Sequence, residues 1–224
     1  MQLVKPSTEI LFINAEALQL IEVAGRTCYK SDGKIKAKSA PRFAKMILKS
    51  GHESVIEHAT ATVRFICDRG VTHEIVRHRL ASYSQESTRY CDYSNGHVAF
   101  VIPPWTQLSS GIYNIGWNGL FGSCCEMERK KISEVDRRYF WSLAVAERDY
   151  QELSRSGWRP EQARSVLPNS LKTEIVMTAN LREWRHFFKL RTSAAAHPQM
   201  REVEAPLLEK MKARVPVIFD DLMD

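Results

Sequence analysis

The spacing of apolar residues switches between two periods along the chain, and this switch constrains the fold more than any other feature of the sequence. In residues 132–153, apolar residues recur every three or four positions, which is typical of an amphipathic helix. In residues 59–67, apolar and polar residues alternate and β-branched residues are frequent, which is typical of a strand. Helices and strands do not alternate regularly, so we predict an α+β fold with a central, mostly antiparallel sheet flanked by helices.

Start and stop signals place the remaining elements. Asn14 is expected to cap a helix, and Asn180 with Glu183 three residues later resembles a capping box. The other helices are predicted over residues 14–28, 39–51, 72–79, 160–167, 180–191 and from residue 198 onward, with Pro206 inside the last. Further strands are predicted over residues 97–102 and 171–177. The polar residues 82–87 suit a binding loop, and the Gly-rich residues 109–123 receive no assignment.

Length and charge indicate one domain with anionic partners. The chain has 224 residues and no stretch that reads as a linker, so we expect a single domain over residues 1–224. A net charge of +6 favours nucleic acid, an acidic membrane surface or phosphorylated small molecules, and cannot choose among them. Apolar runs are too short for a membrane span and the first residues lack the apolar core of a signal peptide, so we expect a cytoplasmic protein.

Common cofactor and metal motifs are missing from the sequence. The five cysteines include no C-x-x-C pair, so neither a disulfide framework nor a zinc site is indicated, and we predict no metal site. No Walker loop or G-x-G-x-x-G is present, and the spaced glycines Gly116, Gly119 and Gly122 follow no convincing strand. Any nucleotide must therefore be held by side chains.

The segment from Arg77 to Tyr90 carries the most chemical information. It contains three arginines, a histidine, three serines and an amide. An arginine fork matches phosphate oxygens, while Ser and Gln side chains can read the polar edge of a base. A lone R-H-R would more often be the solvated end of a basic helix. The whole segment, by contrast, is suited to holding a nucleotide monophosphate.

The order of these residues resembles a known signature. R-H-R, seven residues, then Ser87 with Arg89 two positions beyond is similar to the motif of the flavin-dependent thymidylate synthases. The resemblance extends from about Arg26 to Glu202. Three further blocks carry it: Gly51-His52-Glu53-Ser54 with Glu57-His58, Arg164-Ser165-Val166-Leu167-Pro168, and Asn180-Leu181-Arg182 followed by His186, with Leu190-Arg191 completing the set.

The resemblance assigns roles to individual residues. It implies FAD contacts at Ser54, Arg77, His78, Arg79, Asn180, Leu181, Arg182 and His186. It implies dUMP contacts at Glu74, Arg77, Gln85, Glu86, Ser87, Thr88, Arg89, Arg164 and Arg191. Arg191 is the implied catalytic residue, because its counterpart contacts the uracil and promotes ionisation. The sequence departs from the family at Glu86, an acid where relatives are often apolar, and at Cys28, where some carry serine.

The resemblance also implies a reaction and an assembly. The reaction is reductive methylation of dUMP to dTMP, with 5,10-methylenetetrahydrofolate as carbon donor and NADPH as reductant through FAD. No cysteine lies in the Pro-Cys-His setting expected for the nucleophile of the classical thymidylate synthase. The family is homotetrameric with sites shared between subunits, so we expect a homotetramer with small-molecule substrates and neither nucleic acid nor membrane as partner.

Two other readings stay open at this point. The basic charge and the arginines near Tyr83 and Tyr90 also suit a nucleic-acid-binding protein without enzymatic activity. A nucleotide-binding flavoprotein that lacks methyl transfer would fit as well. Taken singly, Arg164 and Arg182 read as ordinary surface arginines, since arginine is mostly exposed.

Overall fold

A computed structural model describes residues 1–222 of the chain. Four strands form the largest sheet, in the order β2 (Ser7–Ile13), β3 (Thr60–Asp68), β9 (Lys172–Asn180) and β4 (Ala81–Gln85). The sheet is antiparallel and accompanied by helices, which confirms the predicted α+β class. Met223 and Asp224, the last residues of the predicted single domain, lie outside the described residues.

The remaining elements are short strands and helices. The strands are β1 (Gln2–Val4), β5 (Ala99–Val101), β6 (Gly111–Ile112), β7 (Gly116–Asn118) and β8 (Phe121–Ser123). The α-helices are α1 (Ala17–Thr27), α2 (Ala40–Lys49), α3 (Arg69–Ile75), α4 (Cys125–Glu128), α5 (Glu134–Arg155), α6 (Pro160–Ala163), α7 (Leu181–Arg191) and α8 (Pro198–Arg214). The 3-10 helices are η1 (Asp32–Lys34), η2 (Glu53–His58) and η3 (Arg164–Val166). No helix within residues 1–222 has the length and apolar character needed to cross a membrane.

Contacts within the chain group it into two compact units. Unit 1 comprises residues 1–7, 66–73 and 85–174, and unit 2 comprises residues 8–65, 74–84 and 175–224. The strands of the four-stranded sheet lie mainly in unit 2, and the chain passes between the units along β3, β4 and β9. A single domain therefore stays a prediction, and each unit is described by itself.

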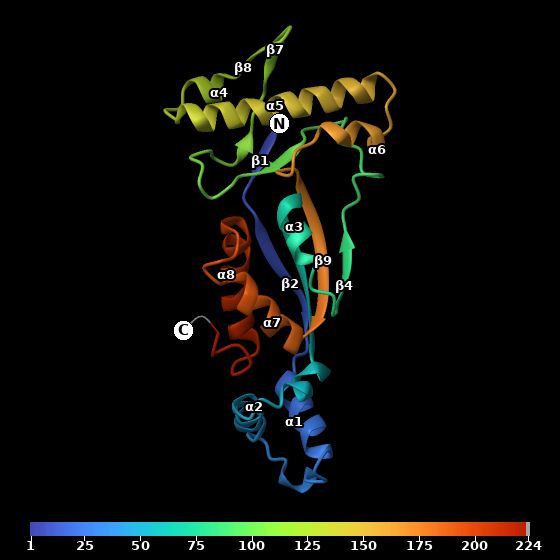
Figure 1. Ribbon diagram of the computed structural model, residues 1–224, viewed down its shortest axis with the longest axis vertical. Coiled ribbons are helices and arrows are strands. Elements are labelled where there is room, and N and C mark those ends of the chain that lie inside the picture. Colours follow the sequence, from blue (N-terminus) through green and yellow to red (C-terminus); the bar gives the residue numbers. More distant parts are fainter. Residues whose placement is uncertain (223–224) are drawn as a thin grey trace. The chain divides into compact units, whose positions relative to one another are not determined.

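Unit 1 is organised by α5, the longest helix in the described part of the chain (yellow in Figure 1). Its buried face contributes Phe140, Leu143 and Tyr150 to a core that also contains Leu3 and Phe100. Leu3 and Phe100 lie opposite each other in the parallel strands β1 and β5. The three- and four-residue spacing of apolar residues in residues 132–153 therefore corresponds to a helix. The helix ends just before Gly157, whose φ is +92°.

Unit 2 is held together by α7, which packs against η2 and α8 (Figure 1). Trp184 is fully buried. Its ring centroid lies 6.3 Å from that of Phe65 of β3, on which it stacks, and 5.4 Å from that of Phe187. Its indole N–H donates to the carbonyl of Ala61 at 3.1 Å, so the ring's one polar atom is satisfied inside the core. The alternating residues of β3 and β9 place their apolar positions on the buried face, as the sequence predicted.

Several local predictions were wrong in informative ways. Asn14 does not cap α1, because its side-chain oxygen accepts the backbone N–H of Thr60 at 2.7 Å instead. Helix α3 begins at Arg69 rather than Thr72, because the carboxylate of Asp68 accepts the N–H of Val71 at 2.9 Å. Residues 81–85, within the predicted polar loop, form the strand β4, whose exposed serines alternate with half-buried residues at the sheet edge.

Candidate active site

The Arg77–Arg79 turn lies in unit 2, directly after α3 and before β4. The one hydrogen of the Tyr83 phenol is shared between the carbonyls of Ile75 at 2.9 Å and His78 at 2.6 Å, which fixes the backbone before the turn and within it. Burial is the main reason that the pKa of Tyr83 rises to about 12, so the phenol stays protonated as a donor. The turn therefore presents exposed Arg77 and Arg79 on either side of a buried His78.

The proton on His78 can be assigned from its neighbours. Its Nε2 accepts the Nε–H of Arg191 at 3.1 Å, since a guanidinium has only donors. Its Nδ1 must then carry the hydrogen and donate to the carboxylate of Glu183 at 3.0 Å. Burial, with the nearby Arg191 charge, lowers the pKa of His78 despite Glu183, which agrees with a neutral ring. His78 therefore links Glu183 to Arg191.

Arg191, at the end of α7, is held by three hydrogen bonds. Besides the one to His78, it donates to the Glu74 carboxylate at 2.7 Å and to the Glu74 carbonyl at 2.9 Å. Its side chain is only 16% exposed, so the guanidinium has a fixed plane and a partly dry environment. Burial raises the pKa of Glu204, on α8, well above its usual value, so this carboxyl is neutral and leaves Glu74 as the anionic partner.

Two cavities open on this cluster in unit 2. One, of about 290 Å³, is lined by the Arg77–Arg79 turn together with Leu80, Glu183, His186, Leu190 and Arg191. The other, of about 520 Å³, is lined by Glu53, Glu57, Leu80, Asn180, Arg182, Glu183, His186 and Lys189. Leu80, Glu183 and His186 line both. The two volumes are of the size typical of small-molecule sites.

The larger cavity is lined by cations that already have acidic partners. Arg182 donates to Glu57 at 2.6 Å and lies 3.9 Å from Glu53, and Lys189 lies 3.9 Å from Glu53. The side chains of Arg182 and Lys189 are about half exposed, so these surface ion pairs can exchange for an anionic ligand at small cost. Together with the exposed His186, they give a donor set that fits the pyrophosphate of a dinucleotide.

His78, Glu183 and His186 each have one potential metal-ligand atom, and these three atoms lie within 4.8 Å of one another. Both nitrogens of His78 are already engaged, one by the cationic Arg191 and one by Glu183. A metal ion would have to displace these hydrogen bonds beside a guanidinium, which opposes its charge. The hydrogen bonds and the neighbouring guanidinium therefore disfavour a metal ion on His78.

Two predicted flavin contacts lie outside the lining of these cavities. Ser54 is exposed on η2, next to the lining residue Glu53. The side chain of Leu181 is fully buried, and its backbone N–H donates to the carbonyl of Ala59 at 2.9 Å. Contacts of FAD with these two residues stay predictions.

Most of the predicted dUMP residues lie in unit 1. Gln85, at the end of β4, donates to the hydroxyls of Thr72 at 3.1 Å and Thr173 at 3.3 Å. Arg164 donates to the buried Thr88 at 3.0 Å. The hydroxyl of Ser87 accepts the backbone N–H of Arg89 at 3.3 Å, and Arg89 lies 3.6 Å from Glu161. The sequence-distant Arg164 is thus brought to the Gln85–Arg89 segment. Glu74, Arg77 and Arg191 lie in unit 2 instead.

Comparison with known proteins identifies the family. Residues 9–217 match the family described as thymidylate synthase complementing protein. The chain belongs to this family. It is 34% identical over 206 residues to a flavin-dependent thymidylate synthase of Mycobacterium sp. (strain JLS), covering 90% of this chain and 78% of the relative. A flavin-dependent thymidylate synthase of Mycobacterium tuberculosis is also 34% identical, over 209 residues with the same coverage.

A solved structure supports the same assignment. The crystal structure of a UMP/dUMP methylase from Streptomyces cacaoi, bound with 5-Br dUMP, matches with a TM-score of 0.73 and 25% sequence identity. The match covers 98% of this chain and 96% of the methylase chain. The resemblance read from R-H-R and its companion blocks is therefore confirmed at the level of the family.

Sequence reasoning missed several residues around the site of this family member. Glu183 was interpreted only as part of a capping box, yet its carboxylate binds His78 while its backbone N–H donates to Asn180 at 2.8 Å. Leu80 and Lys189 also line the cavities and were not predicted, whereas Glu53 and Glu57 lie in one of the blocks that carry the family resemblance. A signal was available for Glu183, because it precedes His186 by three positions and so shares its helix face.

Proposed function

We propose that the protein is a flavin-dependent thymidylate synthase that converts dUMP to dTMP. The carbon donor is 5,10-methylenetetrahydrofolate, and the reductant is NADPH through FAD. The observation that carries this proposal is the orientation of Arg191 by Glu74 and His78 at a cavity shared with Arg77 and Arg79. Family membership and the names of the mycobacterial relatives support it.

The residues of unit 2 suit a flavin dinucleotide. Arg77, His78 and Arg79 line one cavity, Asn180 and Arg182 line the other, and His186 lines both. When bound, FAD supplies the hydride that turns the transferred one-carbon unit into a methyl group. The protein's part is to bind the dinucleotide with cationic side chains and to keep His78 neutral through burial and the nearby charge of Arg191, while Glu183 fixes the orientation of its ring.

Nucleotide binding is assigned to the second set of residues. Arg89 and Arg164 are exposed cations suited to a phosphate, while Gln85 and Ser87 offer neutral hydrogen-bonding groups for the pyrimidine or sugar. Arg191 is the catalytic residue: its cation stabilises negative charge that develops on the uracil ring. Glu74 contributes by fixing the plane of Arg191, so its place among the dUMP contacts is indirect in this proposal.

A second candidate substrate is UMP. The Streptomyces protein is called a UMP/dUMP methylase, and its solved structure shares the fold over nearly the whole chain. The two nucleotides differ only in the sugar 2′-hydroxyl, so one hydrogen-bonding or excluding side chain near the ribose decides between them. Both nucleotides therefore belong in the test of function.

The purified protein is expected to carry FAD without a covalent bond and to release tritium from 5-tritiated dUMP when NADPH and methylenetetrahydrofolate are present. Its absorbance spectrum should show flavin bands, and 5-tritiated UMP should be processed more slowly. A colourless protein that takes up no added FAD would point to the nucleic-acid-binding alternative. Bound FAD without tritium release would identify a flavoprotein lacking methyl transfer, and faster release from UMP would change the substrate.

We also propose that the active protein is a homotetramer whose sites are shared between subunits, as the family resemblance implies. Light scattering of the FAD-loaded protein should then give about four times the mass of one chain. Mixing Arg191→Ala with Arg164→Ala, assayed at a dUMP concentration too low to support turnover by either variant alone, should restore part of the activity if different subunits supply these residues to one site. A monodisperse monomer with full turnover would rule out the shared site.

A further inference from the structure

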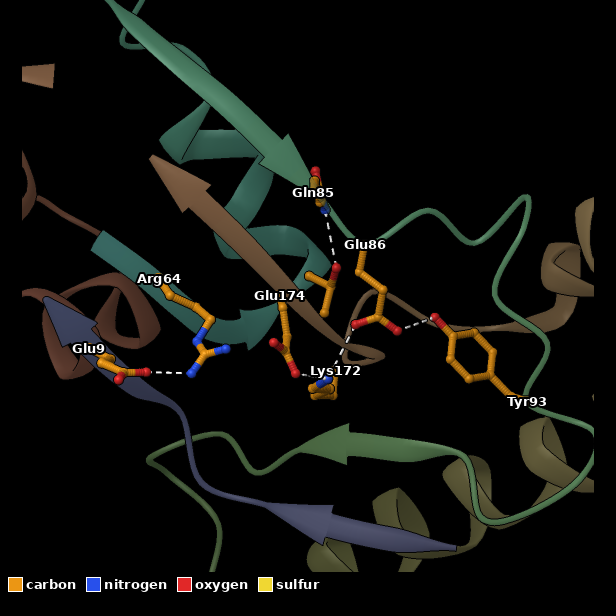
Figure 2. Close-up of polar contacts among 8 residues, drawn as sticks. Glu9, Arg64, Gln85, Glu86, Tyr93, Lys172 and Glu174 are labelled. Atoms are coloured by element: carbon orange, nitrogen blue, oxygen red, sulfur yellow. Dashed lines mark hydrogen bonds and ion pairs between the residues drawn. The ribbon is translucent and has the colours of Figure 1, made fainter. Parts of the chain in front are cut away.

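The carboxylate of Glu86 is committed to protein partners, although it lies inside the segment assigned to the nucleotide. One of its oxygens accepts the phenol of Tyr93 at 2.7 Å, and the other accepts the ammonium of Lys172 at 3.2 Å. Lys172 also donates to Glu174 at 2.7 Å (Figure 2). The side chain of Glu86 thus ties the nucleotide-binding segment to Tyr93 and to Lys172, and Lys172 in turn is held by Glu174.

Tyr93 and Lys172 each hold one charge state around neutral pH. Burial and the hydrogen bond to Glu86 raise the pKa of Tyr93, so the phenol keeps its proton and donates it. Burial alone would lower the pKa of Lys172, yet Glu174 and Glu86 outweigh this effect and the net shift is upward. Lys172 already pairs with two carboxylates, so its charge is not available to a phosphate.

The same group is anchored to rigid elements of unit 1. The backbone N–H of Tyr93 donates to the hydroxyl of Tyr150, a fully buried residue of α5, at 3.2 Å. Lys172 is the first residue of β9, and the backbone N–H of Glu86 donates to the carbonyl of Glu174 at 2.8 Å. Glu86 is therefore tied to a long helix on one side and to a strand on the other.

From this arrangement, which rests on the proposed function for its ligand, we infer that Glu86 is a positioning residue for the nucleotide-binding segment. Its side chain does not contact dUMP. Through Tyr93 and Lys172 it fixes the backbone between Gln85 and Ser87, so that these two neighbours face the nucleotide in one orientation. The binding contacts then need less ordering when dUMP arrives, which increases affinity.

The test compares single and paired replacements in the FAD-loaded protein. Glu86→Leu and Lys172→Met should each weaken dUMP binding, measured by isothermal titration calorimetry, by about tenfold, because each breaks the ion pair between Glu86 and Lys172 that holds the segment to β9. The double variant should recover to within about threefold of wild type, because apolar residues of similar size can replace an ion pair as a unit. The pair Glu9→Leu and Arg64→Met removes an exposed ion pair between β2 and β3 (Figure 2) and serves as the matched control.

A second readout does not require the nucleotide. Amide hydrogen exchange of a peptide spanning residues 85–93 should accelerate in Glu86→Leu, because the bonds that hold Glu86 N–H and Cys91 N–H open more often. The control protein that carries Glu9→Leu and Arg64→Met should keep the FAD content and the thermal unfolding midpoint of the wild type. Suppose that the wild-type protein binds neither dUMP nor UMP while amide exchange still accelerates in Glu86→Leu. In that case Glu86 still positions the segment of residues 85–93, and it is the proposed function that fails.

Two results would overturn the inference itself. Wild-type dUMP affinity in Glu86→Leu would show that the anchor does not position the segment. A loss of dUMP affinity in Glu86→Leu with wild-type amide exchange over residues 85–93 would show that the Glu86 carboxylate contacts the nucleotide directly.

Discussion

Arg191→Ala is expected to lower kcat by about 10²- to 10³-fold while the protein retains FAD. The loss is this large because a preorganised cation that stabilises developing charge typically contributes about 3 to 4 kcal/mol to the transition state. In the structure Arg191 is already held in place by His78 and Glu74, so no reorganisation is needed when the uracil becomes negative. The measurement is steady-state NADPH oxidation coupled to dTMP formation, together with the flavin spectrum of the purified variant.

Two further variants separate charge from geometry. Arg191→Lys should remain well below wild type at saturating dUMP, because an ammonium cannot engage Glu74 and His78 as a planar fork. Arg164→Ala should raise the KM for dUMP more than it lowers kcat, because Arg164 is exposed and contacts the segment through Thr88. Near-wild-type kcat in Arg191→Ala would move the charge-stabilising role to another cation, and Arg89 would be tested next.

The sequence identified the family signature but carried no information about how the residues of that signature are oriented. R-H-R and its companion blocks are read directly from the chain, because a family signature needs only residue types and spacing. The path from Glu183 through His78 to Arg191 joins residues more than a hundred positions apart, and no local pattern encodes it. The proton position on His78 followed only when both neighbours were known.

The fold shows the same division between local and distant causes. The helix of residues 134–155 and the strands β3 and β9 were predictable, because their apolar spacing reflects burial of one face. Asn14 was misread, because its side chain accepts from the distant Thr60 instead of capping α1. Asn180 does cap α7 through the N–H of Glu183, but the Glu183 carboxylate binds the distant His78 instead of completing a capping box. The strands β1 and β2 were missed, since β1 has only three residues and β2 is a largely exposed edge strand.

Helix α7 joins the core of unit 2 to the candidate site. Trp184, Phe187 and Phe188 are fully buried on one face, while Arg182 and His186 face the cavity on the other. A helix fixed along one face by large aromatic rings holds the residues of its other face in a constant register. The geometry of Arg191 therefore depends on packing that makes no contact with any ligand.

Trp184→Ala is expected to lower the free energy of unfolding by about 3 to 5 kcal/mol, because it empties the space of a fully buried ring that contacts Phe65, Phe187 and Phe188. It also leaves the carbonyl of Ala61 without the indole N–H as a donor. Trp184→Phe should lose less, since most of the ring volume remains. Trp158→Ala is the matched control: its ring is 45% exposed, so about 1 kcal/mol or less is expected. Urea unfolding followed by far-ultraviolet circular dichroism measures all three variants. A loss in Trp184→Ala no larger than in Trp158→Ala would mean that α7 is held by its neighbours without this ring, and that the register of Arg191 has another source.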